Sequence, residues 1–365
     1  MSSCRIREYV AAHGWMGVVA RTLVGLVFVF AAVVKAMDPY GTVLKIEEYM
    51  TAIGWMPAGE IATVGAVGLV AVEMLVGCGL LLGAAQRVVA LAALIINSLF
   101  MVLTLWAAIY APVAECGCFG DVVSLTNWQS FAKNVVLVVL SVVALWSVRS
   151  AKWAVGRLVG ALVGCVAVVA LAIYSLILLP PVEKFPFGEG VNLPKAIAEE
   201  LMASQEENYV ICRSKSTGEE RRFLAGDSEW WDENEWEFVE AVASKAESIR
   251  VGARDFRLYI GAMDITAQIL DLPMCRLVCV ENVERLTVGT VAKLQRVAQR
   301  CLSLGNRVVV VTASPLKQAE LYFPNMEMCN MDAVTMRALL RGRAGIVTLR
   351  EGTVEHKATV WGVAL

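Results

Sequence analysis

Long apolar runs fill the first half of the chain, whereas charged residues are dense only in the second half. A helix that crosses the hydrocarbon core of a bilayer needs about 20 apolar residues, because its backbone N–H and C=O groups must all be paired within the helix. Five stretches meet this requirement: 17–37, 61–84, 88–111, 131–146 and 155–179. The pattern therefore predicts a membrane-embedded all-α bundle, a four-helix core followed by a fifth transmembrane helix.

After Lys184 the apolar runs are too short to cross a bilayer and charged residues are dense, as expected for a soluble α/β domain. Its first predicted feature is a hairpin of strands 209–213 and 220–224 around the turn Ser216-Thr-Gly, before an acidic segment that carries Trp230, Trp231 and Trp236. The remaining predicted strands open at Asp255-Phe256 or cover 276–283, 307–312, 345–349 and 353–357, and the helices cover 265–270, 287–304 and 331–340, with a further helix starting at Pro315. Strands that alternate with helices predict a central sheet with flanking helices.

These patterns divide the 365 residues into three parts. Residues 1–150 form the membrane bundle, residues 151–182 form the fifth transmembrane helix and a linker, and residues 183–365 form a soluble domain. A composition of 58 % hydrophobic and 18 % charged residues is too apolar for a wholly soluble chain of this length. The net charge of −2, with no basic stripe, argues against a nucleic-acid partner, so the lipid bilayer is the first expected partner.

The basic residues near the spans predict an orientation. They are Arg5, Arg7, Arg87, Arg149, Lys152 and Arg157, and all fall on one side if the five helices alternate. The opposite loops are mainly acidic, with Lys45 and the span-end residues Lys35 and Lys133 as exceptions. We therefore expect a bacterial inner-membrane protein with a cytoplasmic N-terminus. The loop after the third span and the C-terminal domain would then lie on the periplasmic side.

One acidic residue, Glu73, lies deep inside the second span. A charge at that depth costs a few kcal/mol, so Glu73 should face the bundle interior and find a partner. Arg21 in the first span and Asn97 in the third are the candidate partners. The group has two interpretations, a buried structural pair or a proton or ligand site. Small residues such as Gly25 and Gly77 predict close helix contacts in the same bundle.

The segment Cys116-Gly-Cys118 follows the third span directly. Two thiols separated by one residue can close only a small and strained disulfide, and a strained exposed disulfide exchanges readily with other thiols. Three interpretations remain open: a redox-active pair (Cys116 and Cys118 as catalytic residues), a static disulfide, or a pair of metal ligands. The metal interpretation is weakest, because the chain has only two histidines and neither is near this loop. Lys45, Glu48 and Asp121 are further candidate residues of the outer loops.

Most of the remaining cysteines are predicted to be ordinary packing residues, and Cys212 and Cys329 are left without an assignment. Cys275 and Cys279 lie on the same face of a predicted strand, about 13 Å apart, and so cannot bridge each other. Cys301 falls on the apolar face of a predicted helix. Five cysteines in the soluble domain leave at least one without a partner inside that domain.

The membrane half resembles the DoxX/MauE group of small four-helix membrane proteins. The resemblance covers about residues 15–150 and is carried by Arg21-Thr-Leu-Val-Gly, Lys35-Ala-Met-Asp-Pro, Lys45-Ile-Glu-Glu-Tyr, Glu73-Met-Leu-Val-Gly and Cys116-Gly-Cys-Phe-Gly-Asp. What it implies is membrane-associated thiol or quinone redox chemistry: disulfide formation in a periplasmic dehydrogenase of methylamine utilisation for MauE, and quinol or sulfur oxidation for DoxX. Quinone is therefore the one cofactor that the resemblance suggests.

Residues 250–365 resemble a thioredoxin-like fold, most clearly in the terminal Arg343-Ala-Gly-Ile-Val-Thr-Leu-Arg-Glu-Gly-Thr-Val. Thioredoxins carry a cis-proline at the place that Ala344 occupies here, and no Cys-x-x-Cys occurs in this chain. The resemblance therefore implies the fold without its dithiol chemistry, and we interpret the domain as a binding or docking module.

Three functional hypotheses follow. The first is a thiol–disulfide oxidoreductase, or an accessory of one, in which Cys116 and Cys118 exchange disulfides with a periplasmic partner protein. The second is a non-catalytic assembly protein whose bundle anchors the C-terminal domain. The third is a transporter or quinone-binding subunit centred on Glu73 and Arg21.

Overall fold

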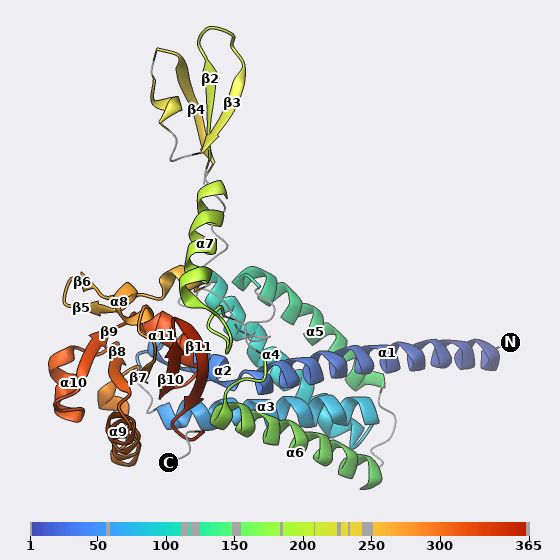
Figure 1. Ribbon diagram of the computed structural model, residues 1–365. Helices are drawn as coiled ribbons and strands as arrows, with labels where there is room; N and C mark the ends of the chain where they lie inside the picture. The colour runs from blue at the N-terminus through green and yellow to red at the C-terminus, as the bar shows by residue number, and fades with distance from the viewer. Residues whose placement is uncertain are drawn as a thin grey trace. The chain divides into compact units, whose positions relative to one another are not determined.

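The computed structural model describes residues 2–55, 59–110, 117, 125–147, 155–182, 185–207, 209–224, 228–232, 234–242 and 251–362. The chain forms two compact units, Met1–Pro181 and Val182–Leu365 (Figure 1).

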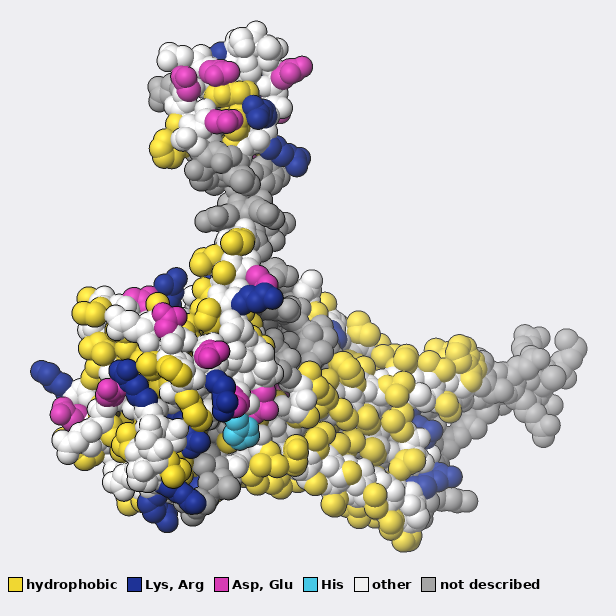
Figure 2. Space-filling model, viewed as in Figure 1, with side chains coloured by type: hydrophobic (Ala, Val, Ile, Leu, Met, Phe, Trp, Pro, Cys, Tyr) yellow, Lys and Arg dark blue, Asp and Glu magenta, His cyan; other side chains and the backbone are white. Residues whose placement is uncertain are grey.

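Within its described residues, the first unit contains five helices that are long and apolar enough to cross a membrane, which confirms the five predicted spans. They are α1 (Ser2–Met37), α3 (Gly59–Leu82), α4 (Gln86–Tyr110), α5 (Asn127–Ser147) and α6 (Val155–Leu178). On the face of the bundle seen in Figure 2, most of the coloured side chains of these helices are hydrophobic. A surface of this kind fits contact with lipid, where the backbone is paired within each helix and apolar side chains face outward.

Glycines allow α1 and α3 to approach each other closely. A Cβ atom added at Gly77 would lie 2.8 Å from the backbone nitrogen of Val29, and one added at Gly25 would lie 3.2 Å from the carbonyl oxygen of Gly77. Small residues permit such backbone contact between helices in lipid. The predicted packing role of Gly25 and Gly77 is therefore confirmed, and this contact fixes the register of α1 on α3.

A further helix, α2 (Pro39–Ala52), occupies the segment that sequence analysis treated as the first outer loop. Asp38 caps it by accepting a hydrogen bond from the backbone N–H of Gly41 at 3.3 Å, and Pro39 supplies the fixed φ that suits a first helical turn. Thr42, Lys45, Ile46, Tyr49 and Met50 follow the i, i+3, i+4, i+7, i+8 spacing of one helix face.

The second unit contains helix α7 (Leu193–Glu207) and a three-stranded antiparallel sheet in the order β3-β2-β4. Strands β2 (Tyr209–Ser214) and β3 (Glu220–Leu224) form the predicted hairpin. Strand β4 (Trp236–Val242) was not predicted as a strand. It pairs antiparallel with β2, and its Trp236 packs edge-on against Phe223 of β3 at a ring distance of 4.7 Å, so two aromatic side chains of the sheet share one small core.

A seven-stranded mixed sheet has the order β11-β10-β7-β8-β9-β5-β6. Its strands are β5 (Tyr259–Ile260), β6 (Met263–Asp264), β7 (Cys275–Val280), β8 (Arg307–Thr312), β9 (Glu327–Asn330), β10 (Ala344–Arg350) and β11 (Thr353–Thr359). Strand β7 pairs parallel with β8 and antiparallel with β10, which forms the predicted terminal hairpin with β11. The short strand β9 was not predicted.

Helices cover both faces of this sheet. One core contains side chains from α8 (Thr266–Leu270) and α11 (Ala333–Leu340), and the other contains side chains from α9 (Val288–Ser303) and α10 (Leu316–Tyr322). Strand residues alternate between the two cores, with Leu277 in the first and Val278 in the second. The predicted α/β architecture of this region is therefore confirmed.

The predicted strand at Asp255-Phe256 is wrong. Residues Ala253–Asp255 form a 3₁₀ turn instead, because the Asp255 carboxylate accepts a hydrogen bond from the backbone N–H of Gly252 at 2.8 Å and bends the chain. The strand begins later, at Tyr259.

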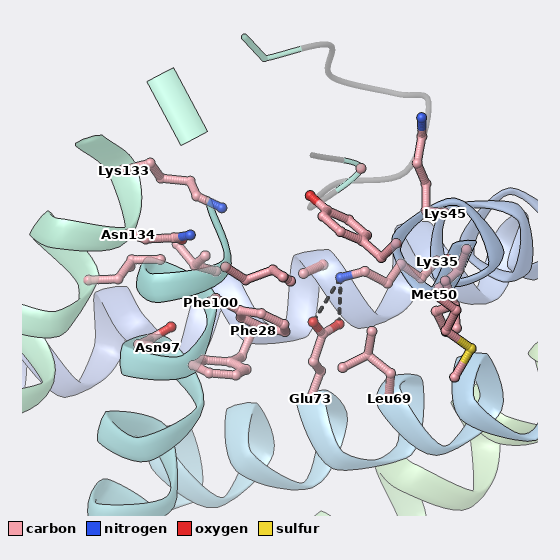
Figure 3. Close-up of a pocket in the computed structure, with 18 residues that line it drawn as sticks. Phe28, Lys35, Lys45, Met50, Leu69, Glu73, Asn97, Phe100, Lys133 and Asn134 are labelled. Carbon is pink, nitrogen blue, oxygen red and sulfur yellow. Dashed lines mark hydrogen bonds and ion pairs between the residues drawn. The ribbon is translucent and has the colours of Figure 1, made fainter. Parts of the chain in front are cut away.

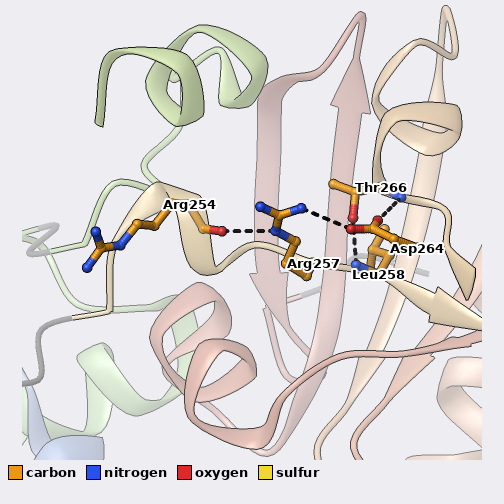
Figure 4. A network of polar contacts seen from close by, with 5 residues as sticks. All are labelled: Arg254, Arg257, Leu258, Asp264 and Thr266. Atoms are coloured by element: carbon orange, nitrogen blue, oxygen red, sulfur yellow. Dashed lines mark hydrogen bonds and ion pairs between the residues drawn. The ribbon is translucent and has the colours of Figure 1, made fainter. Parts of the chain in front are cut away.

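A polar network fastens the short β5–β6 hairpin to α8 (Figure 4). Asp264 accepts hydrogen bonds from the backbone N–H of Thr266 at 2.8 Å and from the Arg257 guanidinium at 3.0 Å. The Thr266 hydroxyl accepts in turn from the backbone N–H of Leu258 at 2.8 Å. These contacts, above all those with Thr266, hold the pKa of the Asp264 carboxyl below its usual value.

All five cysteines of the second unit are buried free thiols. Cys279 on β7 and Cys329 on β9 flank Val311 of β8 in register, and Cys275 lies on the same face. Burial raises the pKa of Cys275 to about 11 and that of Cys329 to about 12. These thiols stay protonated and covered at neutral pH, which makes them poor nucleophiles.

We expect the five thiols of the second unit to resist alkylation in the native full-length protein, because they are buried. Peptide-resolved mass spectrometry after a short maleimide pulse at pH 7 measures this directly, and the same pulse in strong denaturant serves as the control for reactivity. Rapid native labelling of Cys279 or Cys329 would contradict the buried arrangement.

Replacing Asp264 by Ala should lower the free energy of opening of the β5–β6 hairpin by about 1 kcal/mol, because a carboxylate that binds a backbone N–H at a helix start is lost. Hydrogen exchange of residues 257–270 in the full chain measures this loss. Because the folded-state pKa of Asp264 is depressed, its contribution should be present at neutral pH and fade as the pH falls through that pKa. Equal exchange rates in the variant and the parent protein would show that the network contributes nothing.

Candidate functional site

A buried ion pair joins α1 to α3 inside the bundle. The Lys35 ammonium donates to both carboxylate oxygens of Glu73, at 2.8 and 2.9 Å. The two residues are only 3 % and 2 % exposed. Glu73 does face the interior, as expected, but its partner is Lys35 and the prediction of Arg21 or Asn97 is wrong.

The helix contact described above explains this pairing. Counted from the Gly77–Val29 contact, Glu73 lies about 6 Å along α3 and Lys35 about 9 Å along α1 in the same direction, since the helices are antiparallel and rise about 1.5 Å per residue. The long lysine side chain covers the small remaining offset. By its position in the sequence, Lys35 counts as a span-end residue on the outer side, and for that reason it is not among the predicted partners of Glu73.

A cavity of about 230 Å³ lies beside the ion pair (Figure 3). Its lining combines apolar side chains from α1, α3, α4 and α5 with a smaller number of polar groups. The lining residues are Val27, Phe28, Ala31, Lys35, Thr42, Lys45, Ile46, Tyr49, Met50, Leu69, Glu73, Asn97, Phe100, Leu103, Gly117, Lys133, Asn134 and Leu137. A concave, mostly apolar site with a few convergent polar groups is the usual form of a small-molecule site.

Amide and hydroxyl side chains join α4 to α5 along one wall. Asn97 donates to the Ser141 hydroxyl at 2.9 Å, and Asn134 donates to the Thr104 hydroxyl at 3.1 Å. Hydrogen bonds of this kind hold helices together where lipid offers no competing water. They place Lys133, the neighbour of Asn134, on the cavity wall, and Figure 3 shows its ammonium directed toward the Lys35–Glu73 pair.

Helix α2 contributes its 42/45/46/49/50 face to the cavity. The hydroxyl oxygens of Thr42 and Tyr49 are buried and have no hydrogen-bond partner among the described residues. Burial, with a smaller effect from the Glu48 carboxylate, raises the pKa of Tyr49 to about 12. Tyr49 therefore remains a protonated hydroxyl at neutral pH, able to donate. The periodic face of α2 in the sequence was the signal that could have identified this helix as part of a site.

Gly117, the residue between the two cysteines of the Cys-Gly-Cys segment, also lines the cavity. Its φ of +68° favours glycine, and a Cβ atom there would come within 2.7 Å of the Lys45 side chain. Lys45 itself pairs with Glu48 at 2.8 Å near the surface, so the two predicted outer-loop residues are in contact.

The other predicted site residues have different outcomes. Asn97 reaches the cavity, but Arg21 packs beside Gly83, after the end of α3, and is not among the residues that line the cavity. Cys116, Cys118 and Asp121 lie outside the described residues, so their roles stay predictions. Among the residues that the structure does describe, no group of three or more His, Cys, Asp or Glu side chains could hold a metal ion.

Residues 13–147 match a family model described as methylamine utilisation protein MauE. The match begins inside α1, ends with the last residue of α5 and includes every residue that lines the cavity. No curated protein and no solved structure matches the chain.

Removing one partner of the ion pair should destabilise the bundle. We expect Glu73→Gln to lower the unfolding free energy by about 3 kcal/mol, because Lys35 is left buried without its carboxylate. The double variant Lys35→Met/Glu73→Leu should lose less than Glu73→Gln, since it removes both charges. Unfolding of the detergent-solubilised protein by sodium dodecyl sulfate, followed by circular dichroism, provides the measurement.

The control is Glu60→Gln, which neutralises an exposed carboxylate in the first turn of the same helix. It should leave the unfolding free energy within about 0.5 kcal/mol of the parent value. A Glu73→Gln protein as stable as this control would show that the pair contributes nothing to stability.

Proposed function

We propose that this MauE-type membrane protein is an accessory protein of methylamine utilisation that exchanges disulfides with an extracytoplasmic partner through Cys116 and Cys118. The observation that supports the proposal best is the position of Gly117. This glycine links the two cysteines and lines the cavity that contains the Lys35–Glu73 pair. Gly117 and the intramembrane polar residues, which are far apart in the sequence, therefore line one cavity.

The proposed reaction is an exchange that conserves electrons. A thiolate of the partner attacks the Cys116–Cys118 disulfide and forms a mixed disulfide, and a second partner thiolate resolves it. The partner gains a disulfide, and Cys116 and Cys118 become thiols. Their reoxidation releases two electrons and two protons, which a membrane quinone takes up to become a quinol, or which pass to a partner membrane protein.

The proposed topology puts this chemistry in an oxidising compartment. The distribution of Lys and Arg in the short loops favours a cytoplasmic N-terminus in the bacterial inner membrane, with residue 117 and the C-terminal domain on the periplasmic side. Disulfides persist on that side and are rare in the cytosol.

The soluble domain is proposed to position the partner. The parallel β7–β8 pair next to the antiparallel β10–β11 hairpin, with helices on both faces, supports a thioredoxin-like arrangement for residues 250–365. Its thiols are buried and no Cys-x-x-Cys is present, so the domain itself would not exchange disulfides. Docking is the role that this combination leaves.

Thiol trapping in intact cells tests the proposal. With a membrane-impermeant maleimide, wild-type protein should show a Cys116–Cys118 disulfide that becomes reduced when the partner is being oxidised. Cys116→Ser and Cys118→Ser should each abolish methylamine-dependent growth. The matched control is Cys165→Ser, which replaces a thiol in α6 that does not line the cavity.

Two outcomes would reject the exchange reaction. One is a pair that stays reduced under all growth conditions. The other is normal growth of both serine variants; if deletion of residues 183–365 then abolished growth, the protein would be a non-catalytic assembly factor instead.

A further inference from the structure

One part of the cavity lining in the bundle is apolar, and the rest is polar. Phe28, Phe100, Leu69, Leu103 and Leu137 provide aromatic and aliphatic surface. Such surface favours an apolar ring or chain and excludes a strongly hydrated ion. Any ligand of this cavity must therefore be largely apolar.

The polar part of the lining is positively charged. Lys35, Lys45 and Lys133 bring three ammonium groups, whereas Glu73 is the single carboxylate among the described lining residues. Counting Glu48, which pairs with Lys45, the balance is still three positive charges against two negative ones. Figure 3 shows Lys35 and Lys133 directed toward the interior from different helices. A low-dielectric surrounding strengthens the attraction of such a site for an anion.

Two hydroxyl groups in this lining also need a hydrogen-bond partner. Thr42 is 5 % exposed, and its hydroxyl oxygen has no partner in the described part of the protein. The Tyr49 hydroxyl, two turns along the same face of α2, is in the same situation. Buried hydroxyls without a partner are uncommon in native proteins and call for an explanation. An oxygen-bearing ligand would supply acceptors for both.

We propose that this cavity binds an amphipathic organic anion, an apolar chain or ring that ends in a carboxylate. Its apolar part lies among the phenylalanine and leucine side chains, and its carboxylate accepts hydrogen bonds from Thr42 and Tyr49 while Lys133 provides the opposing charge. This assignment does not depend on the thiol chemistry, because no cysteine takes part in it.

The test uses the full-length protein in lipid nanodiscs and radiolabelled decanoate as the probe. Saturable binding is expected, and unlabelled decanoate should compete with it while decanol, which has the same chain and no charge, should not. Lys133→Met keeps the aliphatic stem and should weaken binding by about tenfold or more, because a charge-assisted contact is lost. Thr42→Val should weaken it by about threefold, whereas Thr42→Ser, which keeps the hydroxyl, should not.

A matched control checks that the effects belong to the cavity. Ser175→Ala removes another buried hydroxyl without a described partner, on α6 and outside the cavity lining, and should leave decanoate binding unchanged. Circular dichroism confirms that each variant is folded. Absence of saturable decanoate binding, equal competition by decanol, or parental affinity in both Lys133→Met and Thr42→Val would overturn the proposal. Binding of a short-chain ubiquinone analogue without binding of decanoate would also overturn it, and would assign the cavity to a neutral carbonyl ligand.

Discussion

The arrangement of the bundle depends on one requirement: a lysine and a glutamate must meet inside an apolar structure. Neither Lys35 nor Glu73 could remain charged alone among the surrounding side chains, and their pairing is possible only because Gly25 and Gly77 let α1 and α3 approach closely. The two glycines therefore determine how the helices pair as well as how closely they pack. They set the register that brings the charges together, and the cavity lies where the pair interrupts the apolar packing.

The bundle uses a second kind of polar contact on its other side. Between α4 and α5 the contacts are neutral, amide to hydroxyl, from Asn97 to Ser141 and from Asn134 to Thr104. Neutral hydrogen bonds cost less to bury than charges and still exclude alternative registers. The charged contact thus joins α1 to α3, whereas the neutral contacts join α4 to α5. The cavity lies between the two helix pairs, bounded by Lys35 and Glu73 on one wall and by Asn97 and Asn134 on another.

The sequence predicted the large features well because each depends on a long periodic signal. All five spans, strand β8 and the terminal hairpin appear where hydropathy and alternation placed them. Helix α2 and strand β4 were missed because their periodic patterns are short and mixed with residues of other kinds. Around β4, these are the acidic and aromatic residues near Trp236. The partner of Glu73 was missed for a different reason. Pairing between helices depends on register, and here register depends on a glycine contact that no single helix reveals.

The buried thiols of the second unit have a consequence for how the protein is made. In the proposed topology this domain would cross the inner membrane unfolded into an oxidising compartment, where its five cysteines would be open to incorrect cross-links. Once Cys275, Cys279 and Cys329 are enclosed by the sheet and its helices, that risk ends. Correct maturation of this chain in the proposed topology therefore requires that its core folds faster than its thiols are oxidised.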